Sequence, residues 1–177
     1  MVIRVLVALG ASALALGVPA VSAAQDATPA IDGVAAEKAC KKLKGKAAQD
    51  PTKLEACHNA GRAYGTGDYG VSERSAALSE EYLAKACNGG LGKSCSLLSW
   101  YYLDNSAYQT DAAVSRKWDE KGCEVGDATA CSGMGYWLGE DGDIEAAKQY
   151  YRKAIELRPD YEYAKKKLAE LEAKQAD

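Results

Sequence analysis

Apolar residues recur every three to five positions through most of the chain. In one clear example, Ala77, Leu78, Tyr82 and Ala86 place their side chains on a single face of a helix. Glycine-rich segments such as residues 89–92 separate these apolar series and supply turns. The pattern therefore predicts short amphipathic helices that turn back on one another.

The pattern itself repeats along the chain. Cys87 is followed after 36 residues by Cys123, and Cys95 after 36 residues by Cys131. The surrounding residues align in the same register, since Ala77, Tyr82, Lys85 and Ala86 match Ala113, Trp118, Lys121 and Gly122. A period near 36 in helical sequence is typical of stacked helical hairpins. We therefore expect an all-α fold, an αα-hairpin repeat solenoid, over residues 36–174.

The segment after residue 145 keeps this register without the cysteines. Tyr150 and Ala154 match Tyr82 and Ala86, whereas Ile155 stands at the cysteine position. The helix expected last in the chain is rich in Lys and Glu, as is typical of a terminal cap whose outer face meets water. We expect the hairpin to persist here without a disulfide.

Six cysteines provide the covalent part of the prediction. A disulfide needs Cα atoms within roughly 7 Å, whereas residues eight positions apart on one helix are about 12 Å apart. The chain must therefore turn back inside each C-x7-C segment, and Gly126 followed by Asp127 is a typical helix end and helix cap. Zinc is the alternative, but the chain has one His and no C-x2-C spacing. We predict three disulfide staples, the last by elimination: Cys87–Cys95, Cys123–Cys131 and Cys40–Cys57.

The N-terminus has the composition of a signal peptide. Arg4 precedes an apolar run that ends in the small residues Ser22–Ala24. We predict that residues 1–24 are removed on export and that residues 25–35 form a flexible linker. No other apolar stretch is long enough to cross a bilayer, so no membrane span is expected after cleavage. The predicted location is the periplasm or the outside of the cell, where disulfides persist.

Charge argues against nucleic acid as a partner. The formal net charge is −3, and removal of residues 1–24 takes away one Arg to leave −4. The densest basic cluster, Lys165–Lys167, has acidic neighbours on the same predicted helix. Phenylalanine is absent, so tyrosine and tryptophan must supply the bulky contacts of the core and of any binding face.

With these residues the chain resembles the Sel-one-like repeat (SLR) family, a relative of the tetratricopeptide repeat (TPR), and in particular its cysteine-rich secreted bacterial members. In that family a large apolar, a small and an aromatic residue follow the second cysteine of each unit at +3, +4 and +7. The corresponding residues here are Ala60, Gly61 and Tyr64; Leu98, Ser99 and Tyr102; and Met134, Gly135 and Leu138, the last of which departs from the aromatic. Residues 145–171 are similar to a true TPR. The resemblance implies stacked hairpins whose first helices line a concave side.

Residues of the usual catalytic kinds are scarce. We interpret the single histidine, His58, as a helix-face residue because it lies beside a predicted half-cystine. Some cysteine-rich SLR proteins carry penicillin-binding or β-lactamase labels, yet S-x-x-K, K-T-G and G-x-S-x-G motifs do not occur in the chain. The acidic segment 140–143 lacks the spaced ligands of a calcium loop and is interpreted as a solvated turn. We expect no enzyme, metal site or cofactor; the alternative is a protein that binds or hydrolyses β-lactams or peptidoglycan.

The predicted site is a surface. Positions +1 and +5 after the second cysteine share a helix face that the core positions do not use, and they include the Arg and aromatic residues enriched at binding hot spots. These residues are His58, Arg62, Ser96, Trp100, Ser132 and Tyr136. An alternative for Trp100, Tyr101, Tyr136 and Trp137 is that they only pack neighbouring repeats. We predict a scaffold or adaptor that binds a protein or peptide on its concave face. The roles of some exported SLR proteins imply a narrower version, an immunity-type inhibitor of a periplasmic toxin.

Overall fold

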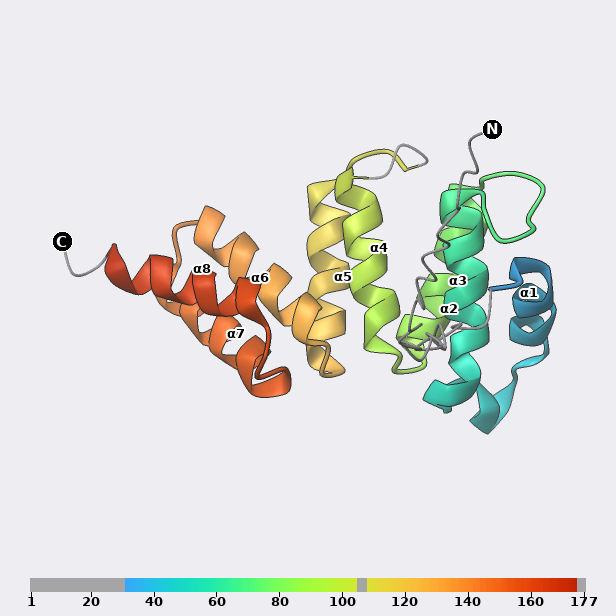
Figure 1. Ribbon diagram of the computed structural model, residues 1–177, viewed down its shortest axis with the longest axis horizontal. Helices are drawn as coiled ribbons and strands as arrows, with labels where there is room; N and C mark the ends of the chain where they lie inside the picture. Colours follow the sequence, from blue (N-terminus) through green and yellow to red (C-terminus); the bar gives the residue numbers. More distant parts are fainter. Residues whose placement is uncertain (1–30, 105–107, 175–177) are drawn as a thin grey trace, which may run out of the picture.

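The computed structural model describes residues 31–104 and 108–174. Within these ranges every regular element is a helix, which confirms the all-α prediction. The helices form an elongated array from α1 at one end to α8 at the other (Figure 1). They are α1 (Gly33–Lys42), the 3-10 helix η1 (Gly45–Gln49), α2 (Pro51–Thr66), α3 (Ala76–Asn88), α4 (Gly92–Asp104), α5 (Ala112–Glu124), α6 (Ala128–Glu140), α7 (Ile144–Leu157) and α8 (Glu162–Ala173).

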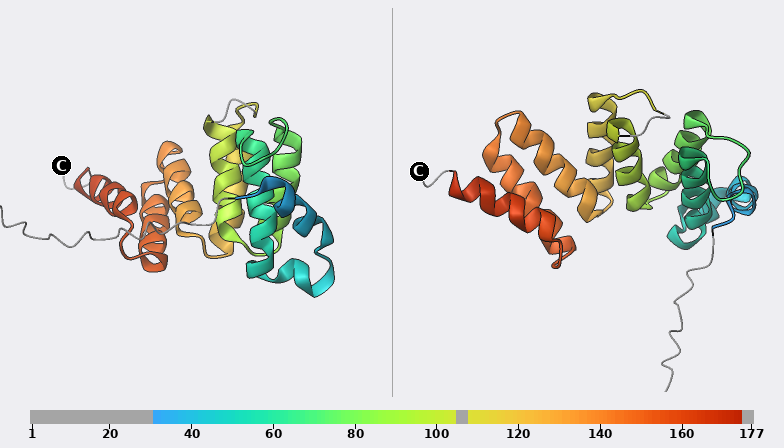
Figure 2. Two further views of the ribbon diagram at one scale, coloured as in Figure 1. Left: turned by 45° about the vertical axis from the view of Figure 1, so that its right-hand side comes forward. Right: turned by 45° about the horizontal axis from the view of Figure 1, so that its top comes forward.

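Consecutive helices pack as hairpins. Helix α2 packs against α3, α4 against α5 and α6 against α7, while α1 and α8 cover the two ends (Figures 1 and 2). The buried residues form three clusters along the array, which include Tyr82, Leu98 and Tyr151 respectively. Each repeat thus builds its own part of the core against its neighbours, as a solenoid does.

Small residues let the two helices of a hairpin approach closely. A Cβ atom at Gly61 of α2 would collide with Leu83 of α3. Ser99 holds the corresponding position in α4, and its hydroxyl lies 2.9 Å from that of Ser115 on α5. The +4 positions of the repeat are therefore core contacts, in agreement with the resemblance.

The turns between repeats share one geometry, which accounts for the 36-residue period. The Leu91 amide donates to the Ala86 carbonyl at 3.0 Å, and the Asp127 amide donates to the Gly122 carbonyl at 2.9 Å. Both bonds close the last turn of a helix. Gly126 has a φ of 85°, which glycine adopts without strain, and the Asp127 side chain then caps α6.

Three disulfides join the cysteines in the predicted pairing. The Cα atoms are 4.7 Å apart in Cys40–Cys57, 5.0 Å in Cys87–Cys95 and 4.4 Å in Cys123–Cys131. The first ties α1 to α2, the second the end of α3 to the start of α4, and the third α5 to α6. The last two therefore fasten the chain where one hairpin is followed by the next.

The predicted linker, residues 25–35, is wrong at its C-terminal boundary. Residues 33–35 form the first turn of α1. The Asp32 carboxylate caps this turn by accepting from the Ala35 amide at 2.9 Å, and the Gly33 amide donates to the Tyr69 carbonyl at 2.7 Å. These bonds give the turn partners that a flexible linker lacks, so the helical domain begins at Gly33.

The predictions about export and membrane insertion have different outcomes. The predicted signal peptide (1–24) and the linker residues up to 30 lie outside the described residues and stay predictions. In the part of the chain that the structure describes, no helix is both long and apolar enough to cross a bilayer.

Candidate functional site

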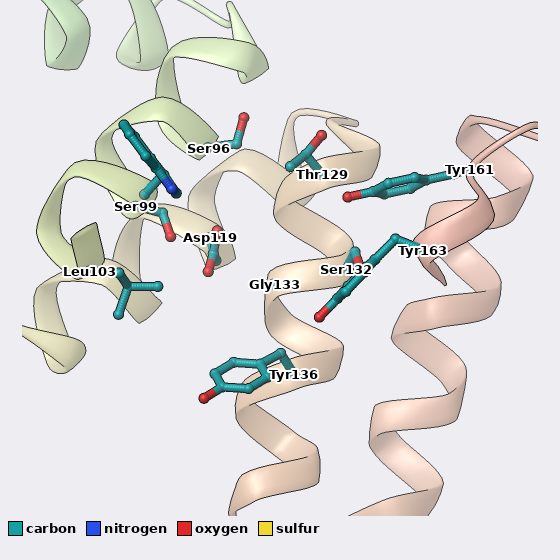
Figure 3. A pocket seen from close by; sticks show the side chains of 11 residues that line it. Ser96, Ser99, Leu103, Asp119, Thr129, Ser132, Gly133, Tyr136, Tyr161 and Tyr163 are labelled. Carbon is teal, nitrogen blue, oxygen red and sulfur yellow. The ribbon is translucent and has the colours of Figure 1, made fainter. Parts of the chain in front are cut away.

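Two adjoining pockets lie on the face formed by the first helices of the repeats. The α4–α8 pocket has a volume of about 290 Å³, and the α2–α4 pocket has a volume of about 350 Å³. They share Ser96, Trp100 and Thr129, so together they form one groove across the repeats. The α4–α8 pocket (Figure 3) is lined by Ser96, Ser99, Trp100, Leu103, Asp119, Thr129, Ser132, Gly133, Tyr136, Tyr161 and Tyr163, and the α2–α4 pocket by His58, Arg62, Lys93, Ser96, Leu97, Trp100 and Thr129.

All six residues predicted for the concave face line this groove. Of these six, Trp100 and Tyr136 carry large rings, with 50% and 40% of their surface exposed. Such large, exposed rings offer apolar area that a ligand can cover. His58 and Ser132, by contrast, are buried and contribute to the floor of the groove.

His58 is held as a neutral side chain. Its Nδ1 atom lies 2.9 Å from the Ser94 hydroxyl, and the ring is 7% exposed. Burial, together with the positive charges of Lys93 and Arg62, lowers the pKa of His58 to about 3. Ser94 is fully buried, so this Ser–His pair packs α2 against α4 and presents no nucleophile to the groove.

Both interpretations of the aromatic residues apply, each to different side chains. Tyr101 is 2% exposed and belongs to the core, and Trp137 is half-buried against the core near α7. Trp100 and Tyr136 instead face the groove, as described above. A tilted ring contact at 5.4 Å (Trp100 to Tyr101) and an edge-to-face contact at 5.1 Å (Tyr136 to Trp137) link each groove residue to its less exposed neighbour.

A buried carboxylate forms part of the floor of the α4–α8 pocket. Asp119 of α5 is 5% exposed and accepts a hydrogen bond from Trp137 Nε1 at 2.9 Å. Burial raises the pKa of this carboxyl to about 6, while hydrogen bonds with Ser99 and Trp137 oppose the increase. A Cβ atom at Gly133 of α6 would collide with the carboxylate, so the glycine leaves it room (Figure 3). Most Asp119 side chains are therefore ionised at neutral pH although they are buried.

Sequence reasoning did not single out Asp119, yet the repeat contains a signal for it. In the 36-residue register Asp119 corresponds to Leu83, which is fully buried. An acidic residue at a core position of a repeat is unusual, because an unpaired buried charge is unfavourable. Comparison of the repeats position by position would have found it.

The start of α8 completes the α4–α8 pocket, and the sequence pattern did not predict this either. Tyr161 and Tyr163 project from this segment towards α6 (Figure 3). Arg158 links α6 to the start of α8 at the mouth of the pocket. It donates to Thr129 Oγ1 at 2.6 Å, and its guanidinium lies 4.1 Å from the centre of the Tyr161 ring. These contacts bring side chains from three repeats around one cavity.

The groove has the chemistry of a binding surface. Its lining consists of aromatic rings, hydroxyls, one buried carboxylate and, in the α2–α4 pocket, the cations Arg62 and Lys93. Within residues 31–104 and 108–174, no three side chains of His, Cys, Asp or Glu come together as metal ligands would.

The chain is similar to known repeat proteins. A family model described as a tetratricopeptide repeat matches residues 128–161, which contain the α6–α7 hairpin. Among solved structures, a Sel1 repeat protein from Oxalobacter formigenes is 27% identical with a TM-score of 0.52, over 73% of this chain and 56% of that one. The chain thus spans little more than half the length of that relative. None of the curated proteins matches the chain.

Proposed function

Since the chain is a repeat protein of the Sel1 and tetratricopeptide type, we propose that it binds an extended peptide segment of another protein in the groove, without catalysis. The observation that carries the proposal is the exposure of Trp100 and Tyr136 inside a groove that successive repeats share. Rigid aromatic rings over a polar floor are typical of binding hot spots.

The dimensions of the groove suit a short peptide. Helices in direct contact lie about 8–10 Å apart, so a groove that crosses from α2 over α4 and α6 to the start of α8 extends over at least roughly 25 Å. An extended chain spans about 3.3–3.6 Å per residue, so a peptide of about eight residues would cover this length. Arg62 in the α2–α4 pocket and Asp119 in the α4–α8 pocket give the groove opposite charges that would orient such a peptide, while Lys93 beside Arg62 is paired with Glu55 at 2.7 Å.

The covalent structure favours an exported protein. All six cysteines are paired, and disulfides persist in oxidising compartments such as the periplasm or the cell exterior. We therefore place the proposed binding there. The protein would then meet its partner after export, when its disulfides have formed.

Peptide selection tests the proposal directly. Peptides of about eight residues would be selected on the oxidised protein, and their dissociation constants measured for the parent and for Trp100→Ala and Tyr136→Ala. We expect each variant to bind about tenfold or more weakly, as truncation of a hot-spot residue does. Val34→Ala is the control, because Val34 is 54% exposed on α1 and lies outside the groove. Selected peptides that bind all four proteins equally would refute the proposal, provided that the variants keep the helix content of the parent.

A narrower form of the proposal is an immunity-type inhibitor that occludes a toxin in the periplasm. A toxin gene beside the gene for this protein would support it. The oxidised protein should then neutralise that toxin, and Trp100→Ala should not. Equal neutralisation by both would exclude the groove as the inhibitory surface.

A further inference from the structure

Asp119 carries a buried charge that no cation in the described residues neutralises. It takes part in none of their ion pairs, and its hydrogen-bond partners, Ser99 and Trp137, are both neutral. Arg158 at the mouth of the pocket is engaged by Thr129 and the Tyr161 ring instead. Buried charges are normally paired with an opposite charge. The α4–α8 pocket therefore offers a negative site that is not used within the described part of the chain.

A second polar group in the same pocket lacks a partner. The Ser132 hydroxyl is buried, with the residue 2% exposed, and it forms no hydrogen bond within the described residues. Nearly all buried polar atoms in proteins have a partner, so such a group calls for one. Ser132 and Asp119 both line the α4–α8 pocket, from α6 and α5 respectively (Figure 3). A ligand that donates hydrogen bonds would serve the carboxylate, and it would also serve the Ser132 hydroxyl once the side chains that cover this hydroxyl move aside.

The walls of the pocket suit a cation with an apolar stem. Trp100, Tyr136 and Tyr163 are 50%, 40% and 46% exposed and come from three different helices. The face of an aromatic ring attracts a cation and also packs against methylene groups. At about 290 Å³ the pocket lies at the small end of the roughly 300–1,000 Å³ usual for ligand sites, so it suits one side chain.

We propose that the α4–α8 pocket takes a lysine side chain of the bound peptide. The ammonium group donates to the Asp119 carboxylate and, once the side chains over it move aside, to the Ser132 hydroxyl, and the methylene groups lie against the rings of Trp100, Tyr136 and Tyr163. This inference rests on the proposed function and adds the chemistry of the partner: an extended peptide with a lysine at the position that reaches α6.

Lysine fits this carboxylate better than arginine does. Trp137 already occupies Oδ2 of Asp119, and Ser99 also hydrogen-bonds to the carboxyl. A guanidinium binds best when both carboxylate oxygens are open to a bidentate pair. An ammonium is a point charge with three rotatable N–H donors, so it can donate to Asp119 with one and to Ser132 with another.

The three tryptophans allow a test with a small probe. Nα-acetyl-lysine methylamide would be titrated into the oxidised, 15N-labelled protein while the three indole N–H signals are followed. We expect saturable shifts at Trp100, which lines the pocket, and at Trp137, which donates to Asp119, but not at Trp118, which lies in a different hollow. The same compound acetylated at Nε has no charge and should shift none of the three.

Two variants and a control decide the role of the carboxylate. Asp119→Asn should weaken binding of the lysine probe about tenfold or more, as loss of a charged hydrogen-bond partner does. Ser132→Ala should weaken it to a smaller degree. Glu120→Gln is the matched control, since it removes one charge from an exposed position on the same helix and should leave binding unchanged.

Several results would overturn the lysine pocket. These are equal binding of the neutral probe, unchanged binding in Asp119→Asn, or tighter binding of the corresponding arginine derivative. If selected peptides still require Trp100 while the lysine probe does not bind, the groove function stands and the lysine pocket is wrong. If the probe binds but no peptide depends on Trp100, the pocket stands and the peptide-binding function is wrong.

Discussion

We expect Asp119→Asn to stabilise the protein at alkaline pH although it removes a hydrogen-bonded side chain. Asparagine has nearly the shape of aspartate, and its carbonyl oxygen can still accept from Trp137 Nε1. The substitution removes the buried negative charge, which is unfavourable without a cationic partner. A side chain that lowers the stability of the folded protein in this way does not serve packing, which supports a role in binding. The test of stability therefore bears directly on the proposed site.

The magnitude follows from the pKa of the carboxyl. Burial raises the pKa of Asp119 from 3.8 to about 6, and each pKa unit corresponds to about 1.4 kcal/mol, which gives about 3 kcal/mol. The folded pKa is the higher one, so the folded state keeps a proton that the unfolded state releases. Stability therefore falls as the pH rises from 3.8 to 6, and the full loss is present above pH 6. Asparagine does not titrate and escapes this loss.

Urea unfolding at pH 3.5 and pH 8 measures the effect. The free energy of unfolding of Asp119→Asn, minus that of the parent, should be about 3 kcal/mol larger at pH 8 than at pH 3.5. Glu120→Gln should show no such change, because Glu120 is exposed. A variant that is less stable than the parent at pH 8, or a difference that does not depend on pH, would show that the carboxylate is part of the packing. The reasoning for an unpaired charge would then be refuted.

Three further predictions concern the buried histidine, one disulfide and the lack of β-lactam hydrolysis. The pKa of His58 in the folded state is about 3, below its ordinary 6.5, so the unfolded state binds a proton first as the pH is lowered. In urea unfolding, the parent should therefore lose about 3 kcal/mol of stability relative to His58→Gln when the pH is lowered from 7 to 4. Parallel pH profiles of the two proteins would contradict the buried, neutral ring. Cys87→Ala combined with Cys95→Ala should lower stability by about 2–4 kcal/mol, and an unchanged melting temperature would count against the staple. The oxidised protein should not hydrolyse the β-lactam nitrocefin above background; turnover that disappears in Ser94→Ala would overturn the assignment of Ser94 and His58 to packing.

The helices and staples were predictable because their determinants are local. The spacing of Cys87 and Cys95 forbids a straight helix between them, and Gly126 followed by Asp127 ends one helix and caps the next whatever the surroundings. The repeat then extends these local rules to the whole array. The start of the first helix was missed although Asp32 is a local cap signal, and the bond from Gly33 to Tyr69, which lies far along the chain, cannot be read from the sequence.

The binding face was predictable as a face, but its chemistry was not. Helix periodicity puts the +1 residue His58 and the +5 residue Trp100 on the same face of the repeats, yet His58 is buried beside Ser94 of α4 whereas Trp100 is exposed. The environment of Asp119 depends on α4 and α6 as well as on α5, and Tyr163 reaches the pocket only through the packing of α8. Contacts between elements distant in sequence decide such features, and periodicity does not contain them.

Intermolecular nuclear Overhauser effects between a selected peptide and the oxidised protein test the central claim most directly. The account predicts contacts from a lysine side chain of the peptide to the rings of Trp100, Tyr136 and Tyr163. Contacts confined to the opposite side of the hairpins, at Val114 and Trp118 between α3 and α5, would contradict it.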